Sequence, residues 1–147
     1  MIEVRAVTDS AGKVVAPEWL SRAEGVHRQL RAQLPADYIA RMTAIFAGGG
    51  RMFVATSGDA VVGVAVYRVY EATNNGRRCY VDDLVTDEAK RSTGVGHALM
   101  KALESEARRL GCDAFSLDSG THRTAAHKFY FREGMTITSF NFKKTLR

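Results

Sequence analysis

The feature that most constrains this chain is a glycine-containing stretch at residues 90–100, Lys-Arg-Ser-Thr-Gly-Val-Gly-His-Ala-Leu-Met, which follows a strand-like run over residues 79–86. Helical spacing of the apolar residues after Gly96 predicts the order strand, polar loop, glycine turn and helix. Two glycines let the backbone approach a ligand without an intervening Cβ. The first amides of a helix have no internal partners and lie at the positive end of its dipole, which favours phosphate. Arg91 can add a charged donor to the same anion.

Two known phosphate-binding patterns do not fit this stretch. A P-loop requires Gly-x-x-x-x-Gly-Lys-Ser/Thr, and that spacing is absent. A dinucleotide fingerprint requires a third glycine where Leu99 stands, and it directly follows its strand, whereas residues 86–93 form a polar run here. A pyrophosphate loop of another kind and a glycine-rich helix start without a ligand both remain open from these residues alone.

Length and composition favour one ordinary globular domain. The chain has 147 residues, of which 46% are hydrophobic and 25% charged, enough for a sizeable core. It has no apolar run of about 18 residues and no signal-peptide core at its start. Cys79 and Cys112 lack a CxxC spacing, which suits a reducing compartment. We therefore expect a single domain over residues 1–147, a cytoplasmic location and no membrane partner.

The formal net charge of +5 is compatible with nucleic acid, a membrane surface or an anionic cofactor as a partner. The charges are scattered in small clusters, and no basic stripe interleaved with aromatic residues is present. Nucleic acid is therefore a minor alternative.

Patterning along the chain predicts alternating strands and helices of an α/β protein of the α+β type. Three antiparallel strands precede the glycine turn, and a strand–helix–strand order after it implies a parallel pair. Gly63, inside a strand, indicates a bulge or a close backbone neighbour. The expected strands cover residues 2–6, 51–56, 61–70, 78–86, 113–117 and 135–142, and the expected helices cover residues 17–32, 36–46, 94–110 and 122–133.

Two motifs carry a resemblance to a known family. Arg91-x-x-Gly94-x-Gly96 resembles the signature of the GNAT superfamily of N-acetyltransferases, and residues 123–135, Arg-Thr-Ala-Ala-His-Lys-Phe-Tyr-Phe-Arg-Glu-Gly-Met, resemble its closing motif. The family most often has Asn where Arg123 stands and Phe where Met135 stands. The C-terminal half looks closest to aminoalkylphosphonate and related small-amine acetyltransferases. The resemblance implies a mixed, mostly antiparallel twisted sheet with a central splayed parallel pair and about four helices.

The resemblance also implies where acetyl-CoA binds. Coenzyme A enters between the splayed strands, and its pantetheine arm pairs with the backbone of a strand end as an added strand. The implied cofactor contacts lie at that strand end, in the glycine turn and around the last helix: Leu84, Val85, Thr86, Arg91, Ser92, Thr93, Gly94, Val95, Gly96, His122, Arg123, Ala126 and Tyr130.

Acetyl transfer to an amine requires a group that removes a proton from the amine and a group that protonates the departing thiolate. Tyr130 matches the family tyrosine that points at the thioester sulfur; the alternative is a core tyrosine. Asp82 and Asp83 are adjacent carboxylates inside a strand, where charges are unusual and where alternation sends them to opposite faces. Either could take the proton directly or through water, bind the amine electrostatically, or bond a neighbouring backbone. Asp82 is favoured because similar enzymes carry an aligned acid.

The resulting prediction is an N-acetyltransferase that moves the acetyl group of acetyl-CoA directly to the primary amine of a small molecule. The alternatives are a protein lysine or N-terminal acetyltransferase and a non-catalytic coenzyme A-binding module. The four histidines have no metal-ligand spacing, so we expect no metal site. Residues 19–46 are expected to line the acceptor cleft without identifying the acceptor. Relatives are commonly dimers, which implies a homodimer.

Overall fold

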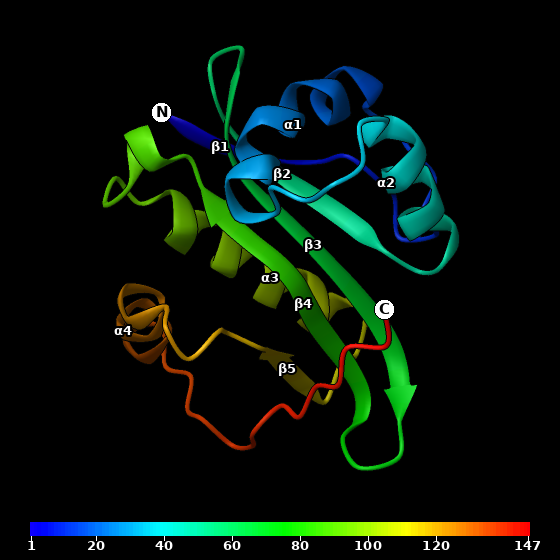
Figure 1. The fold of residues 1–147 in the computed structure, drawn as a ribbon, viewed down its shortest axis with the longest axis vertical. Coiled ribbons are helices and arrows are strands. Elements are labelled where there is room, and N and C mark those ends of the chain that lie inside the picture. Colours follow the sequence, from blue (N-terminus) through cyan, green and yellow to red (C-terminus); the bar gives the residue numbers. More distant parts are fainter. The chain divides into compact units, whose positions relative to one another are not determined.

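The computed structural model describes residues 1–147 and divides into two units, residues 1–116 and residues 117–147, each described here on its own. Up to the end of its sheet the chain forms β1 (Ile2–Ala6), α1 (Pro17–Leu30), α2 (Tyr38–Ala47), β2 (Arg51–Ser57), β3 (Ala60–Ala72), β4 (Gly76–Thr86), a short 3-10 turn (Glu88–Lys90), α3 (Val95–Arg109) and β5 (Ala114–Leu117) (Figure 1). The second unit holds α4 (Thr124–Arg132). None of the helices combines the length and the apolar character needed to span a membrane.

The five strands form one mixed sheet in the order β1-β2-β3-β4-β5. Strands β1 to β4 pair antiparallel with their neighbours, and β4 and β5 form a parallel pair. The prediction of a mostly antiparallel sheet with one parallel pair and four helices is therefore confirmed. The parallel pair requires the crossover through α3, which starts at the glycine turn.

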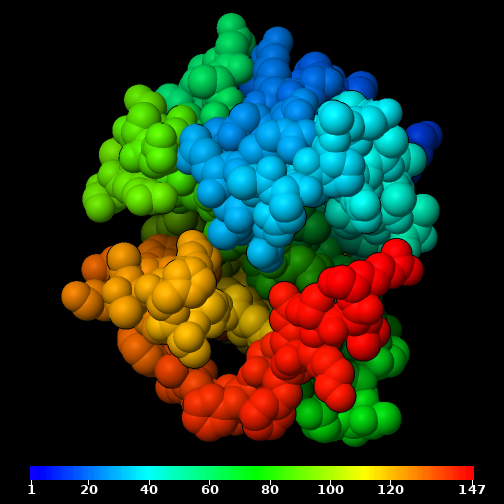
Figure 2. All heavy atoms as spheres, viewed as in Figure 1, coloured from blue at the N-terminus to red at the C-terminus, as the bar shows by residue number.

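Alternation along β3 divides the sheet between two helical layers. Val64 and Val66 pack into a core with buried residues of α1 and α2, including Leu20 and Met42. The opposite face meets α3. In Figure 2 the blue and cyan atoms of α1 and α2 form a continuous layer on one face of the first unit.

Gly63 allows α3 to lie close to β3. A Cβ built on Gly63 would lie 2.7 Å from Val95 Cγ1 and 2.8 Å from Leu99 Cδ1. The register of β2 and β3 also shifts beside this residue, between Ala55 and Thr56. The sequence indicated a bulge or a close neighbour at Gly63, and both are present. Close packing here fixes the start of α3 against the sheet.

The helix and strand bounds follow from local signals in the sequence. Pro17 occupies the start of α1, where its missing N–H is not needed. The Asp37 carboxylate caps α2 by accepting a hydrogen bond from the Ala40 amide. Gly111 and Gly134, with φ of 72° and 86°, follow the ends of α3 and α4. These elements agree with the predicted ranges to within a few residues.

The predicted last strand, residues 135–142, is wrong. Residues 135–147, which we call the C-terminal arm, form no helix or strand, and its apolar side chains Ile137, Phe140 and Phe142 are exposed. Its alternation is suited to a strand, but a strand also needs a neighbour with free backbone groups. Residues 118–147 contain no other strand. The arm's polar contact within this unit is a 2.9 Å hydrogen bond from Asn141 to the Asp118 carboxylate.

Candidate active site

The glycine turn follows β4 through a tightly specified loop. After Thr86, the Asp87 carboxylate accepts a hydrogen bond from the Ala89 amide and starts the short 3-10 turn. Ser92 and Gly94 then adopt positive φ angles of 63° and 91°. Only glycine adopts the second of these without steric cost. A Cβ added at Gly94 would meet no atom within 4 Å, so its backbone is open to an approaching group.

The first turn of α3 presents the backbone amides of Val95 and Gly96 beside this open backbone. Gly94 is the N-cap of α3 and has no side chain that could cap the helix. The first amides of a helix remain available to an anion under those conditions. The structure therefore brings one group of the predicted cofactor contacts into a single turn: Arg91, Ser92, Thr93, Gly94, Val95 and Gly96. This turn fits a pyrophosphate.

The end of β4 has a backbone edge that β5 does not cover. The Asp113 amide donates a 2.7 Å hydrogen bond to the Arg77 carbonyl just before β5 begins. Since β5 has four residues and runs parallel to β4, it reaches about as far as Val81. Leu84, Val85 and Thr86 pair with β3 on one side and lie beyond β5 on the other. This open edge fits an extended pantetheine arm.

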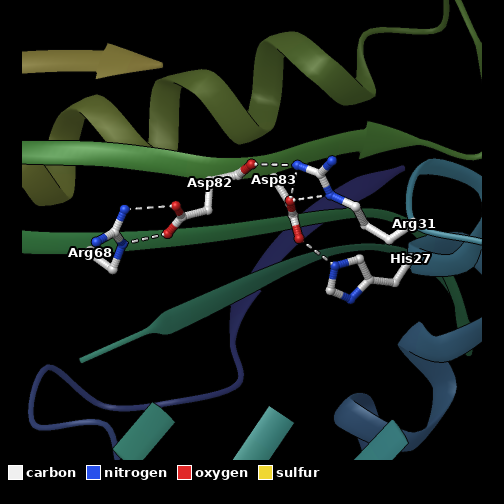
Figure 3. A network of polar contacts seen from close by, with 5 residues as sticks. All are labelled: His27, Arg31, Arg68, Asp82 and Asp83. Atoms are coloured by element: carbon white, nitrogen blue, oxygen red, sulfur yellow. Dashed lines mark hydrogen bonds and ion pairs between the residues drawn. The ribbon is translucent and has the colours of Figure 1, made fainter. Parts of the chain in front are cut away.

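A β-bulge in β4 places both aspartates on one side of the sheet. Val66 pairs with Asp83, whereas the next residue, Tyr67, pairs with Val81, so Asp82 is the extra residue of β4. Arg68, which shares the face of Val66, binds the Asp82 carboxylate, and Asp83 binds residues of α1 (Figure 3). The expectation that the two carboxylates lie on opposite faces is wrong, because strict alternation fails at a bulge.

Asp83 joins β4 to α1 through a partly buried polar network (Figure 3). Its two oxygens lie 2.7 Å from His27 Nε2 and 2.8 Å from Arg31 Nε. The other nitrogen of His27, Nδ1, lies 2.8 Å from the Tyr38 hydroxyl. Burial favours the protonated form of Asp83, but the His27 hydrogen bond and the Arg31 guanidinium outweigh it and lower the pKa of this carboxyl.

Tyr38 and Asp83 bear on which nitrogen of His27 donates a hydrogen bond and which accepts one. Burial strongly raises the pKa of Tyr38, so its phenol keeps its proton. The phenol can donate to His27 Nδ1 while His27 Nε2–H donates to the carboxylate of Asp83. Since the His27 side chain is 1% exposed, it contacts no solvent. Asp83 thus holds α1 against the sheet.

Asp82 is the more accessible of the two carboxylates. Its side chain is 32% exposed, compared with 14% for Asp83. Arg68 binds it through two hydrogen bonds of 2.7 and 2.9 Å, and Arg31 donates to its backbone carbonyl at 3.1 Å. Sequence reasoning missed Arg68. It considered His27 only when excluding a metal site, and Arg31 only as part of the acceptor segment. The signal available in the sequence was that His27 and Arg31 lie one helical turn apart on α1, toward its apolar face.

The second unit carries the remaining predicted residues. Tyr130 is the buried residue of α4, and Arg123 stands at the N-cap of that helix. Burial raises the pKa of Tyr130, and the charge and hydrogen bond of Arg123 partly oppose this shift. His122 lies exposed in the turn before α4, and Ala126 lies on the helix. The Ser119 hydroxyl, which the sequence analysis did not single out, is buried without a hydrogen-bond partner.

No group of three or more His, Cys, Asp or Glu side chains in residues 1–147 is arranged to hold a metal ion.

Comparison with known proteins decides the family. The model of the acetyltransferase (GNAT) family matches residues 17–135. This chain belongs to the GNAT family. It is similar to the N-acetyltransferase YhdJ of Bacillus subtilis, with 33% identity over 86% of this chain and 91% of that protein. It is also 35% identical to the aminoalkylphosphonate N-acetyltransferase of Salmonella typhimurium over 45% of this chain and 43% of that protein.

Solved structures agree with this GNAT fold. The aminoglycoside N-acetyltransferase AAC(6')-Iy in complex with CoA superposes with a TM-score of 0.84 at 18% identity, covering 100% of this chain and 95% of that one. Membership in the GNAT family makes the chain an acetyltransferase that uses acetyl-CoA as its co-substrate.

Proposed function

We propose that this GNAT enzyme transfers the acetyl group of acetyl-CoA directly to the primary amine of a small molecule. The observation that carries the proposal is the construction of β4. One strand supplies two carboxylates at a bulge, an open edge at Leu84–Thr86 and, a few residues later, the glycine turn that opens α3. An acid–base group and a binding surface for the acetyl donor are thereby fixed on the same element.

Acetyl-CoA supplies the activated thioester, and residues of this chain hold it. The amides at Val95 and Gly96 and the side chain of Arg91 bind the pyrophosphate. The open edge of Leu84, Val85 and Thr86 holds the pantetheine arm by backbone hydrogen bonds. Ser92, Thr93 and Gly94 shape the turn, and Ala126, His122 and Arg123 contribute from the second unit.

Asp82 receives the proton of the acceptor ammonium, directly or through one water. It is the more exposed of the two carboxylates, and the paired Arg68 guanidinium orients it. Asp83, occupied by His27 and Arg31, positions α1 beside it.

Tyr130 protonates or hydrogen-bonds the departing thiolate. Burial raises the pKa of its phenol, which keeps its proton at neutral pH, and Arg123 only partly opposes this rise. A phenol whose pKa lies above that of a thiol keeps its proton in the resting enzyme and can still share it with a developing thiolate.

The proposal also covers the domain organisation, the cellular location and the oligomeric state of the enzyme. The family match at residues 17–135 crosses from the first unit into the second, which supports a single catalytic domain over residues 1–147. Cys79 and Cys112 are free thiols, as suits the cytoplasm. The exposed apolar side chains of the C-terminal arm support a homodimer in which a second chain covers them.

An amine-panel assay tests this function. The protein is mixed with acetyl-CoA and small primary amines, aminoglycosides or lysine-containing peptides, and thiol release is measured. We expect release with small amines and an acetylated amine of matching mass. Turnover of peptides alone would assign the enzyme to protein substrates, and binding of acetyl-CoA without turnover of any amine would refute the proposal.

A further inference from the structure

The face of β3 and β4 that carries Asp82 continues away from the glycine turn as an alternating set of charged and aromatic side chains. Arg68 pairs with Tyr80 across the two strands, and Tyr70 pairs with Arg78. The Arg78 guanidinium lies 4.8 Å from the centre of the Tyr80 ring and 6.0 Å from that of Tyr70. The Arg68 guanidinium lies 5.3 and 5.6 Å from the same rings. We call these four residues the arginine–tyrosine ladder.

The ladder has an uncompensated positive charge. Arg68 is neutralised by Asp82, and the neighbouring Arg31 is neutralised by Asp83. Arg78 forms no ion pair with a carboxylate; its Nε donates a 2.7 Å hydrogen bond to the uncharged Ser116 hydroxyl. Two guanidiniums and one carboxylate leave a charge of +1 on the ladder with Asp82. This charge lies on the same face as the proposed proton acceptor.

The geometry preorganises Arg78 as an anion donor. Contacts with the tyrosine rings use the π-faces of a guanidinium, whereas its N–H donors lie in its plane. The Ser116 hydrogen bond fixes one edge of the Arg78 plane, and the other N–H groups remain available. The side chain is half-buried, which strengthens its attraction for an anion relative to a fully hydrated arginine. Arginine in such a setting recognises phosphate or phosphonate oxygens bidentately.

We propose that the arginine–tyrosine ladder is an acceptor subsite that binds a phosphate or phosphonate group of the amine substrate, with Arg78 as its main ligand. The inference rests on the proposed function, because it assigns the acceptor amine to Asp82. Arg78 and Asp82 lie four residues apart on β4, about 13 Å of strand, and the long arginine side chains shorten the distance an acceptor must span. A polycationic amine is repelled by the same charge.

The test compares matched amines that differ only in an anionic group. Glucosamine 6-phosphate is compared with glucosamine, and 2-aminoethylphosphonate with ethanolamine, each with acetyl-CoA. Wild-type protein should prefer the anionic member of each pair. Arg78→Gln should lower kcat/KM for the anionic member by about tenfold to a hundredfold, the worth of a charge-assisted hydrogen bond, and should leave the neutral member unchanged.

Arg77→Gln is the matched control, because Arg77 is the adjacent arginine of β4 and is neutralised by Glu71. It should leave the preference of the enzyme intact. Arg78→Glu, a second variant, should reverse the preference toward the neutral amine. Acetyl-CoA affinity and the melting temperature of each variant establish that it is folded and binds its donor.

The outcomes separate this inference from the proposed function. Turnover of amines with no preference for the anionic member, or an equal effect of Arg78→Gln on both members, would overturn the ladder as a subsite and leave the enzyme assignment intact. Without turnover of any amine the proposed function fails. The subsite is then tested by binding alone. It is supported if 2-aminoethylphosphonate raises the melting temperature of wild type but not of Arg78→Gln, and ethanolamine raises neither. Any other result overturns it.

Discussion

Replacing Asp83 by asparagine should destabilise the protein far more than the same replacement at the adjacent Asp82. Asp83 is 14% exposed and receives two charge-assisted hydrogen bonds, 2.7 Å from His27 and 2.8 Å from Arg31. Each such bond is worth about 1.5–3 kcal/mol, and asparagine keeps one acceptor oxygen. Because Arg31 is 42% exposed and can turn to solvent, we expect a loss of about 2–3 kcal/mol from the free energy of unfolding.

Asp82→Asn is the matched control for this experiment. Its partner Arg68 is 43% exposed and Asp82 itself is 32% exposed, so their ion pair contributes about 0–1 kcal/mol to stability. Urea denaturation at pH 7 measures both variants under the same conditions. Equal losses at the two positions would refute the assignment of Asp83 as the residue that holds α1 against β4.

The pH dependence of the Asp83 effect has a definite sign. The folded protein lowers the pKa of Asp83 below its unfolded value of about 3.9, so its stabilisation is present above the unfolded pKa and is lost as pH falls through the folded one. The stability difference between wild type and Asp83→Asn should therefore shrink below about pH 4, where the carboxyl takes up its proton. A difference that did not shrink as the pH fell from about 4 to about 2 would contradict the ion-pair description.

Three further predictions address the cofactor, the acid and the arm. Gly96→Val should abolish acetyl-CoA binding in calorimetry. The control Gly25→Ala, in α1, should bind normally, because an added Cβ there meets nothing within 4 Å. Unchanged affinity in a folded Gly96→Val would reject the pyrophosphate turn. Tyr130→Phe should lower kcat by about 100-fold with little change in KM for acetyl-CoA and a stability change of about 1 kcal/mol or less; an unchanged kcat would leave Tyr130 as a core residue. Deletion of residues 136–147 should convert a dimer into a monomer by light scattering, and a monomeric wild type would refute the homodimer.

Local chemistry in the sequence was enough to predict most elements and the donor-binding turn. Apolar spacing after Gly96 predicted α3, and Gly111 and Gly134 stand where α3 and α4 end. These signals operate within one or two turns of chain, so they do not depend on distant residues. For the same reason, the glycine turn between β4 and α3 was recognised before the fold was known, and the family resemblance rested on it.

The arrangement of the candidate acid–base residues was decided by tertiary structure. Asp82 and Asp83 share a side of the sheet only because β4 pairs with β3 through a bulge, and pairing register is a property of two strands together. His27 meets Asp83 across 56 residues of sequence, a contact that no local pattern specifies.

The C-terminal arm and the ladder both show that strand pairing decides the outcome. The arm has no partner strand, whereas the ladder is formed by two paired strands. The alternation of residues 135–142 is sufficient for a strand but supplies no partner, so no strand forms within the second unit. Arg68 and Arg78 are ordinary charged strand residues in the sequence, and they gather with Tyr70 and Tyr80 only because the β3–β4 register sets them opposite one another. The sequence alone determined the helices and five of the six expected strands, since these depend mainly on near neighbours. The sheet pairing decided which charges meet, because the energy of each contact depends on both of its members.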